Sequence, residues 1–583
     1  MKQHEIAALF AQMADLLEYR GDNVFRIRAY RRAAQNLESF GGDLEHLAKE
    51  HRLTELSGIG PDLADKIGEY LTTEKIRAIE RLKRTIPRGV LELLNVPGLG
   101  PKTAKLLTER LHIATVDELE AAAKAHRLQT LPGFQEKKEQ NILKGLAVLK
   151  KGRERMDLGT AMALANELFV LLRKVPGVSR VSTAGSLRRM KETIGDLDLL
   201  AASRSPKRVM EAFQRSKFCA RVLAAGMTKS SILTPEGLQI DLRVVPPESF
   251  GAALQYFTGS KEHNVRLRKL AVRQGLKVNE YGVFRLKTNR RIAGREEAEV
   301  YRALGLAWMP PELREDSGEI DAAKAGTLPE LVDARKIRGD FHIHTKWSDG
   351  SDSLEAMAKA GTARGYQYLA ICDHSQSLRV AHGMSVKRLR EQMAEIQALN
   401  ARRSSCRLLM GAEVDILSDG SMDYPDHILA ELDFVVGSIH SGFTQSGAAL
   451  TRRIVTAMRN SYVTLIAHPT GRLMGQREPY PVDLEAVFTA ARETGTALEI
   501  NAYPKRLDLA DAAARRARDV GAMLAISTDS HCLGQLDHMA IGLGVARRAW
   551  LESRHLLNGF SLPQLLAWIG RKRRSAVRRG IRR

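Results

Sequence analysis

The histidines and carboxylates of the C-terminal region constrain the fold of this chain more than any other feature. Most of them directly follow short apolar runs, and the set comprises His342, His344, Asp349, His374, Glu413, His440, His468, Asp529 and His531. In parallel α/β barrels, strands end and active-site loops begin at such positions. A single histidine is usually structural, but a set of this size predicts a metal centre at the strand ends of an α/β domain.

The same ligand set indicates which ions it would hold. Imidazole together with carboxylate suits zinc, manganese or iron, and imidazole binds Mg²⁺ poorly. We therefore expect a cluster of two or three ions, Mn²⁺ or Zn²⁺. Lys505 and Arg506, in the loop NAYPKRLDL, either contact substrate phosphates or lie on a solvated loop. No role is expected for four other histidines, which are His382, His427, His538 and His555.

A second group of carboxylates lies in GSLRRMKETIGDLDLLAAS, residues 185–203. Side chains alternate between the two faces of a strand, so Asp196 and Asp198 share one face. Burial of two neighbouring carboxylates requires a divalent metal or a shifted pKa, whereas a solvated edge strand requires neither. Asp241, in LQIDLRVV, adds a third carboxylate on another strand.

Three carboxylates on two strands predict a two-metal site for Mg²⁺ or Mn²⁺. Paired ions of this kind activate an attacking oxygen and stabilise a leaving phosphate oxygen. The turn at Gly185 and Ser186, followed by Arg188 and Arg189, is suited to cradle a triphosphate. The chemistry expected here is nucleotidyl transfer, which also fits tailing enzymes and antibiotic-modifying enzymes.

Composition bears on the partner and on the compartment. The chain has 90 lysines and arginines against 68 acidic residues, and its net charge of +22 favours a polyanion such as DNA. Four widely spaced cysteines indicate neither disulfides nor a cysteine zinc site. The first residues do not resemble a signal or transit peptide, and no apolar run is long enough to span a membrane. We therefore expect a cytoplasmic monomer with no membrane partner.

The first 150 residues have helical periodicity interrupted by short glycine-containing turns. The turns are LSGIGPDLADKI, NVPGLGPKTAKLL and TLPGFQEKKEQNI, and in the first two we expect helices to begin at Pro61 and Pro101. These turns resemble helix-hairpin-helix units, whose glycines let backbone N–H groups approach a DNA phosphate. The DNA-binding glycines would be Gly58, Gly60, Gly98 and Gly100. Ordinary helix packing is the alternative, most of all for the third turn, which lacks the second glycine.

The central segments together resemble family X DNA polymerases, the family that contains the vertebrate repair polymerase beta. The G-S-x-R-R turn, the G-D-x-D carboxylates and the later aspartate occur in that family's order, and YFTGSKEHNVRLR (256–268) resembles its thumb segment. The resemblance implies catalytic, metal-binding roles for Asp196, Asp198 and Asp241. It implies nucleotide-binding roles, for a dNTP, for Gly185, Ser186, Arg189, Tyr256, Phe257, Gly259 and Asn264, and a DNA-facing role for Arg268.

One residue of the catalytic strand departs from the family pattern. Gln239 stands where the family commonly has an arginine that assists the aspartates. This difference puts the rate of catalysis in doubt, but not the type of reaction.

The first 80 residues resemble the small lyase domain of the same family. Lys66 falls at the position of its Schiff-base lysine, with Arg26 and Tyr30 near a pocket for a 5′-phosphate. A lysine nucleophile needs a lowered pKa, yet Asp62, one turn away, would raise it. The alternative is a solvated lysine that contacts DNA.

The C-terminal region resembles the PHP (polymerase and histidinol phosphatase) domain, a distorted (β/α)7 barrel that cleaves phosphoesters. Bacterial family X polymerases commonly carry this domain at the C-terminus. In some polymerases the domain has lost its ligands and only scaffolds. Every motif position is a potential ligand in this chain, so we expect an active phosphoesterase.

The fold class expected is therefore a multidomain α and α/β protein. The expected domains are 1–82, lyase-like with a helix-hairpin-helix; 83–152, fingers-type with a second one; 153–250, a nucleotidyltransferase palm; 251–315, a thumb; 316–336, a linker; 337–570, the PHP domain; and 571–583, a flexible basic tail. The tail either touches a phosphate backbone or only aids solubility.

The function expected is that of a DNA-directed DNA polymerase that fills short gaps in repair, joined to a metal-dependent 3′–5′ exonuclease or other 3′ end-processing phosphoesterase. One alternative is a template-independent nucleotidyltransferase fused to a phosphatase. The other is a DNA-binding scaffold in which both sites are idle.

Overall fold

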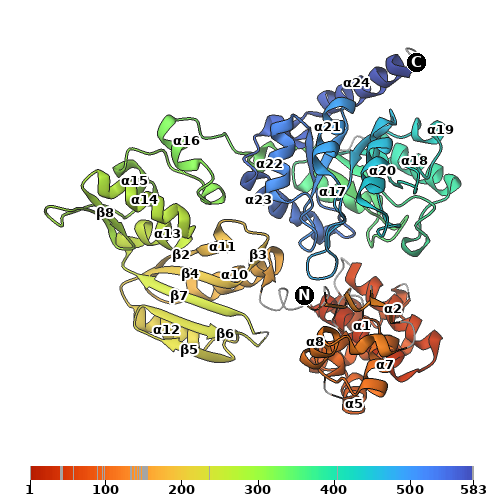
Figure 1. The fold of residues 1–583 in the computed structure, drawn as a ribbon, viewed down its shortest axis with the longest axis horizontal. Helices are drawn as coiled ribbons and strands as arrows, with labels where there is room; N and C mark the ends of the chain where they lie inside the picture. Colours follow the sequence, from red (N-terminus) through yellow and green to blue (C-terminus); the bar gives the residue numbers. More distant parts are fainter. Residues whose placement is uncertain are drawn as a thin grey trace.

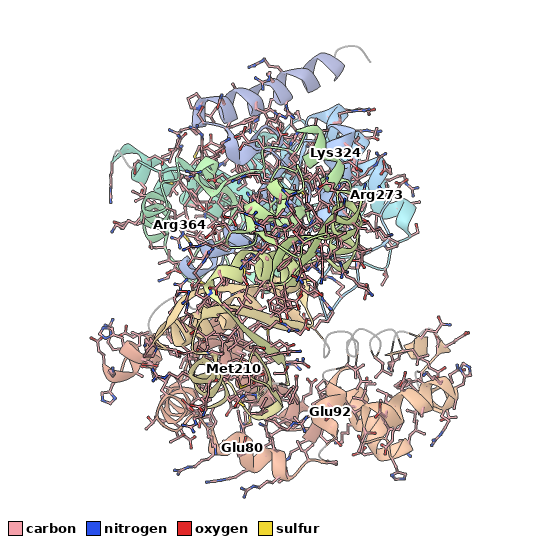
Figure 2. The ribbon with its side chains drawn as sticks, turned by 90° about the vertical axis from the view of Figure 1, so that its left-hand side faces the viewer. Glu80, Glu92, Met210, Arg273, Lys324 and Arg364 are labelled. Atoms are coloured by element: carbon pink, nitrogen blue, oxygen red, sulfur yellow. The ribbon has the colours of Figure 1, made fainter. Side chains whose placement is uncertain are left out.

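The computed structural model arranges the chain as three bodies that follow one another in sequence (Figure 1). They are a helical N-terminal region, a five-stranded sheet with an attached thumb, and a seven-stranded barrel. The structure describes residues 2–39, 44–56, 58–87, 89–94, 96, 99–131, 134–136, 138–140, 142–143, 146, 155–235, 237–402 and 405–580. In the view of Figure 2, Glu80 and Glu92 of the N-terminal helices lie at the opposite end from Lys324 and Arg364.

The N-terminal region is helical throughout its described residues. Its main helices are α1 (Lys2–Arg20), α2 (Val24–Ser39), α3 (Leu44–Lys49), α4 (Pro61–Thr73), α5 (Arg77–Arg84), α6 (Val90–Leu94), α7 (Pro101–Leu111) and α8 (Val116–Lys124). They share one apolar core, to which Phe10, Ile67 and Leu107 belong. Helices α4 and α7 begin at Pro61 and Pro101, as predicted, since proline lacks only an N–H that the first turn leaves unpaired.

The central sheet brings together the strands that carry the predicted carboxylates. Its order is β2 (Val178–Thr183), β4 (Asp196–Ser203), β7 (Gln239–Val245), β6 (Lys229–Leu233) and β5 (Arg221–Ala225). Strands β4 and β7 are parallel, and the other pairs are antiparallel. Apolar residues of β4 and β7 form one core with residues of α10 (Leu158–Arg173) and α12 (Pro206–Gln214). The opposite face carries Asp196, Asp198 and Asp241 at one end, while Leu200, Ala202 and Val245 further along it pack against Phe250 in a second, smaller core.

The thumb follows the sheet. Its elements are α13 (Phe250–Thr258), α14 (Lys261–Arg273), β8 (Leu276–Asn279), β9 (Gly282–Arg285), β10 (Arg291–Ala293) and α15 (Glu297–Ala303). The segment expected to be a linker, 316–336, contains the helix α16 (Glu319–Ala325). Ile320 and Ala323 of this helix join the thumb core around Val283 and Val300. These two apolar residues, three apart, and the buried contact of Glu319 with His263 seat the helix in a segment otherwise rich in proline, glycine and charge.

The C-terminal body is a parallel barrel, as expected. Its strands follow the chain in the order β11 (Gly339–Ile343), β12 (Tyr368–Ile371), β13 (Arg407–Asp415), β14 (Phe434–Ser438), β15 (Val463–Ile466), β16 (Ala497–Asn501) and β17 (Leu524–Ser527). A parallel bridge between Ile343 and Ser530 joins the first strand to the chain after the last one. All seven carboxyl ends therefore face one rim.

The basic tail differs from its expected form. Helix α24 runs from Leu562 to Gly580, where a flexible arm was expected beyond residue 570. Leu565 and Ile569 bury its first turns in the barrel core, and the buried Lys572 donates to Thr496 Oγ1 at 2.7 Å. Among the described residues, no helix has the length and apolar character needed to cross a membrane.

Candidate active sites

The three carboxylates of the central sheet meet because of the parallel register of β4 and β7. Asp198 lies directly opposite Asp241, and Asp196 lies opposite Gln239. The turn at Gly185 closes over this group, since a Cβ atom there would lie 2.1 Å from Asp198 Oδ2. The predicted carboxylates therefore share one face, and only glycine fits beside them.

The surroundings of Asp198 and Asp241 shift their pKa values in opposite directions. Burial and the charges of Asp196 and Asp241 raise the pKa of Asp198 to about 7. Burial also favours the protonated form of Asp241, but hydrogen bonds from Lys229, Gln239 and Ser231 hold its pKa below the ordinary value. Repulsion of this kind between carboxylates is relieved by a bound divalent cation, so the group fits such an ion.

Lys229 is a residue of this site that the sequence did not reveal. Its Nζ lies 2.8 Å from Asp241 Oδ2, while Gln239 Nε2 donates to Asp241 Oδ1 at 2.9 Å. Strand β6 brings the lysine alongside β7, in antiparallel register. A cation thus does accompany Asp241, although Gln239 occupies the position of the family's arginine.

The two arginines of the predicted triphosphate cradle differ in their partners. Arg188 is bound by Glu297, at 2.6 and 2.8 Å, and by Thr258 Oγ1. Arg189 donates through Nη1 to the carbonyl oxygen of Thr258 and through Nε to Glu315 at 3.1 Å. Arg188 therefore ties the turn to the thumb, and Arg189 lies beside the Gly259 segment.

The predicted nucleotide-binding residues of the thumb form a connected group. Tyr256 and Phe257 contact edge to face, with ring centroids 5.1 Å apart. Asn264 Nδ2 donates to the carbonyl oxygen of Tyr256 at 2.7 Å, and Arg268 Nε donates to that of Asn264 at 3.3 Å. A Cβ atom on Gly259 would lie 3.1 Å from Arg189 Nη1. These contacts join the segment to the carboxylate site through Arg189.

Two of the hairpin glycines leave open space at a helix start. Gly60 and Gly100 are the N-caps of α4 and α7, and a Cβ atom on either would meet nothing within 4 Å. Gly58 has φ of +75°, and a Cβ atom there would lie 2.8 Å from Asn36 Nδ2. Gly98 lies outside the described residues.

The lyase-like residues have local partners. Lys66 forms an ion pair with Asp62, one turn away on the same helix, and Arg26 Nη1 lies 3.6 Å from Asp22. Tyr30 packs edge to face on Phe10 in the helical core, and its hydroxyl is buried. Because the hydroxyl of Tyr30 is buried, the structure does not support contact between Tyr30 and a 5′-phosphate.

Glu413 on β13 lies at the centre of the histidine cluster. Its Oε2 atom is 2.8 Å from His374 Nδ1 and 3.4 Å from His342 Nε2. Its Oε1 atom is 3.1 Å from His468 Nε2 and 3.3 Å from His440 Nε2. One carboxylate is thus within reach of imidazoles from four strands of the barrel.

Asp349 and Asp529 extend the cluster on the side of His344. Asp529 Oδ1 lies 3.3 Å from His344 Nε2, and Asp349 Oδ2 lies 3.4 Å from His531 Nε2. Three overlapping groups have ligand atoms within 4.8 Å of one another: His344, Asp349, His374 and His531; His342, His344 and Asp529; and His374, Glu413 and His440. All nine predicted ligands therefore gather at one rim.

The donor set fits transition-metal ions. Buried ring nitrogens that lie near carboxylate oxygens but make no well-directed hydrogen bond include Nε2 of His342, both ring nitrogens of His344, and Nδ1 of His374. Burial and the neighbouring imidazoles of His531 and His374 lower the pKa of His344 to about 3, which keeps its ring neutral. Neutral imidazole is the form that ligates metals, and ligation satisfies an otherwise unpaired buried nitrogen.

Further carboxylates orient the ligands from behind, and the sequence did not reveal them. Glu499 Oε1 lies 2.8 Å from His342 Nδ1, and Glu499 Oε2 accepts from the backbone N–H of His468 at 2.6 Å. Asp415 Oδ1 lies 2.6 Å from His440 Nδ1. Such partners fix the tautomer of a ligating histidine and raise its basicity.

A cavity of about 700 Å³ opens beside the cluster. Its lining includes Asp349, Asp529 and His531 of the cluster together with Lys346, Tyr503 and Arg506. Arg506 Nε lies 3.5 Å from Asp529 Oδ2, whereas Lys505 is exposed. Of the two basic residues singled out in this loop, Arg506 is therefore the one that faces the cluster.

Comparison with protein families finds matches along much of the chain. They are a helix-hairpin-helix domain at residues 1–76, a SAM-like helix-hairpin-helix tandem at 90–147, the DNA polymerase beta thumb at 253–315, and a PHP domain at 340–502. A curated relative from Bacillus subtilis, named DNA polymerase/3′-5′ exonuclease PolX, is 39% identical over 98% of this chain and 100% of its own length. The chain belongs to the family X DNA polymerases that carry a PHP domain.

Other relatives match a smaller share of this family X polymerase. A probable phosphatase of Thermoanaerobacter is 26% identical over 38% of this chain and 91% of its own length. Another, from Acetivibrio thermocellus, is 30% identical over 28% of this chain and 64% of its own length. The predicted family and fold class are thus confirmed by the polymerase relative and the family matches.

Proposed function

We propose that this family X polymerase extends DNA at the carboxylate site of the palm and removes nucleotides from 3′ ends at the histidine cluster of the barrel. The chain is a DNA polymerase with a PHP-type 3′–5′ exonuclease domain, and it binds DNA. The assignment of each activity to named residues is our proposal. The observation that carries the proposal is the presence of two separate and complete sets of metal ligands, one in the palm and one in the barrel.

At the palm, Asp196, Asp198 and Asp241 would hold divalent ions, which would supply neutralisation of phosphate charge and activation of the attacking oxygen. Mg²⁺ suits these oxygen ligands. Arg189 binds the triphosphate of a dNTP, together with the Gly185–Ser186 turn. Tyr256, Phe257 and Gly259 lie against its sugar, and Asn264 and Arg268 face the new base pair.

At the barrel, the nine ligands would hold two or three ions of Mn²⁺ or Zn²⁺, which would supply a nucleophile and charge neutralisation for phosphoester cleavage. Arg506 binds a substrate phosphate in the adjoining cavity. Glu499 and Asp415 keep the histidines oriented.

The DNA contacts that we propose for the hairpins involve backbone N–H groups at Gly60 and Gly100 and are independent of base sequence. A monomeric state and the expected domain boundaries belong to the same proposal, except that helix α16 of the expected linker packs with the thumb and the expected basic tail continues helix α24. A Schiff-base role for Lys66 is less well supported, because its amine is held by Asp62.

Two alternatives have less support. A template-independent transferase with a phosphatase does not account for likeness to a polymerase and exonuclease over nearly the whole chain. A scaffold with idle sites does not account for two ligand sets that are complete and convergent.

The test uses a gapped DNA with a 5′-labelled primer, Mg²⁺ or Mn²⁺, and reactions with and without dNTPs. Asp198→Asn should abolish extension, by several orders of magnitude, and leave primer shortening intact, because it removes a ligand from one site only. His374→Ala should eliminate shortening and leave extension. Loss of both activities in either variant, or survival of the targeted one, would contradict the assignment.

A further inference from the structure

Helix α23 of the barrel (Met539–Arg548) packs against the turn that carries the predicted triphosphate ligand Arg189. A Cβ atom on Gly544 would lie 2.4 Å from Met190 Cε, so the helix approaches the turn closely. Met190 itself has φ of +54°, a conformation that a non-glycine residue keeps only when its surroundings enforce it. Arg548 Nη1 donates to the carbonyl oxygen of Arg189 at 2.8 Å. The nuclease domain thus contacts the backbone of the nucleotide turn directly.

Glu315, at the end of the thumb, joins the same two arginines through its side chain. Its Oε1 atom accepts from Arg189 Nε at 3.1 Å and from Arg548 Nη1 at 2.9 Å, and Lys191 Nζ lies 3.6 Å away. Burial favours the protonated form of Glu315, but the charges of Arg189 and Arg548 hold its pKa below the ordinary value. The carboxylate is therefore ionised and shared between the palm and the barrel.

We propose that Arg548 is a positioning residue of the polymerase reaction, which acts through Glu315 and the Arg189 carbonyl to hold the Arg189 guanidinium ready for the triphosphate of a dNTP. The PHP barrel then completes the nucleotide site of the polymerase in addition to its own activity. This inference rests on the proposed role of Arg189 as a triphosphate ligand.

The physical reason is that Arg189 and Arg548 both bind the carboxylate of Glu315. Arg548 is 6% exposed, so its attraction to Glu315 is weakly screened by water. Without Arg548, Glu315 would be left to Arg189 and Lys191, and it would bind Arg189 more tightly. A guanidinium neutralised in this way attracts a polyphosphate less. The turn would also lose the hydrogen bond that fixes its backbone.

The neighbouring arginine on the same helix provides a matched control. Arg547 binds Glu312 at 2.6 Å and the carbonyl oxygen of Val332 at 3.0 Å. It holds the barrel to the end of the thumb, but no hydrogen bond or ion pair described for it reaches Glu315 or Arg189. General loosening of the domain contact should therefore follow from either substitution, whereas loss of nucleotide positioning should follow only from Arg548.

The experiment measures single-nucleotide gap filling and 3′ trimming by the full chain. Arg548→Met should raise KM for the dNTP about tenfold, the size expected for coupled charges in contact, with kcat and trimming little changed. Arg548→Lys, which keeps the charge beside Glu315, should restore most of the affinity. Arg547→Met should leave KM for the dNTP as it is in the unaltered chain.

The outcomes distinguish the positioning role of Arg548 from the proposed triphosphate-binding role of Arg189. An unchanged KM in Arg548→Met, an equal rise in Arg547→Met, or a parallel loss of both activities would overturn it. Arg189→Gln is measured alongside: if it leaves KM unchanged, the proposed role of Arg189 fails. If Arg189→Gln raises KM while Arg548→Met does not, only the positioning role of Arg548 is overturned.

Discussion

At the scale of single residues, the carboxylates of the palm act with the cations beside them. Asp241 is held ionised by Lys229 and Gln239, whereas burial and the charges of Asp196 and Asp241 raise the pKa of Asp198 to about 7. The three acids lie on two neighbouring strands, and the one on β7, Asp241, is fixed by a lysine from the adjacent strand β6.

Lys229→Met should lower the polymerase rate by about one to two orders of magnitude, since outer partners of metal ligands commonly contribute that much. Loss of its hydrogen bond should raise the pKa of Asp241, so the acid limb of the pH–rate profile should move to higher pH. Lys229→Arg should restore the rate. The prediction fails if the profile of Lys229→Met coincides with that of the unaltered enzyme.

In the barrel, Glu499→Gln keeps the size of the side chain but removes the charge behind His342. Metal affinity and exonuclease activity should fall by about 10- to 100-fold, because the imidazole becomes less basic. Elemental analysis of the dialysed protein measures the bound metal, and primer shortening measures the exonuclease activity. The exposed Glu431, paired with Arg390, provides the control Glu431→Gln. Full metal content in Glu499→Gln would count against an orienting role.

Metal ligands that directly follow a strand could be predicted from the sequence, whereas the residues that hydrogen-bond to those ligands could not. All nine predicted ligands converge, because parallel strands bring their carboxyl ends to one rim. Glu499 lies inside the apolar strand ALEIN, and nothing in that string shows that it reaches His342, which is distant in the sequence. Lys229 was missed for the same reason, since its partner depends on strand order.

At the scale of elements, the N-termini of α4 and α7 leave room for a DNA phosphate to approach closely. Gly60 and Gly100 have φ of −83° and −77°, which any residue adopts. Glycine is therefore not needed there for the backbone conformation. The open space above each helix start is what a larger side chain would remove.

Gly60→Val and Gly100→Val should accordingly leave the thermal midpoint nearly unchanged and weaken DNA binding about fivefold each, the size of one lost hydrogen bond. Fluorescence anisotropy with two duplexes of different sequence measures the affinity, which should fall equally for both. Gly68→Ala, inside α4 and away from the turn, is the control. Undiminished affinity would show that these helix starts do not meet phosphates.

Elements were predicted where a local signal marks them. Pro61 and Pro101 mark the starts of α4 and α7, and the segments DLDLLAAS and LQIDLRVV form the strands β4 and β7, over 196–203 and 239–245. Helix α16 escaped prediction because its apolar residues are few and their partners lie in the thumb.

At the scale of the whole molecule, palm and thumb are joined by a buried group of charges. Glu297 is 8% exposed and accepts hydrogen bonds from Arg188, Arg314 and the indole of Trp308. Burial opposes its ionisation, but Arg314 and Arg188 hold its pKa well below the ordinary value.

Glu297→Gln should destabilise the palm and thumb by about 3 kcal/mol, because it leaves the buried Arg314 and the partly buried Arg188 without their counter-charge. Urea unfolding followed by limited proteolysis measures the effect. In the unaltered chain this stabilisation is complete above the ordinary carboxylate pKa and is lost as the pH falls through the lowered pKa. The acid sensitivity of the variant should therefore be smaller. A variant that matches the unaltered chain in both respects would contradict this role.

The barrel's ligands also have an order in time. A ribosome delivers His342 long before His531, and the strand bridge that closes the rim involves Ser530, beside the last ligand. A growing chain therefore has no complete metal centre until its final barrel strand has emerged. With Arg548 emerging later still, the nucleotide site is also completed last. Premature termination before Arg548 would then release a fragment that lacks the nuclease activity and binds the dNTP more weakly.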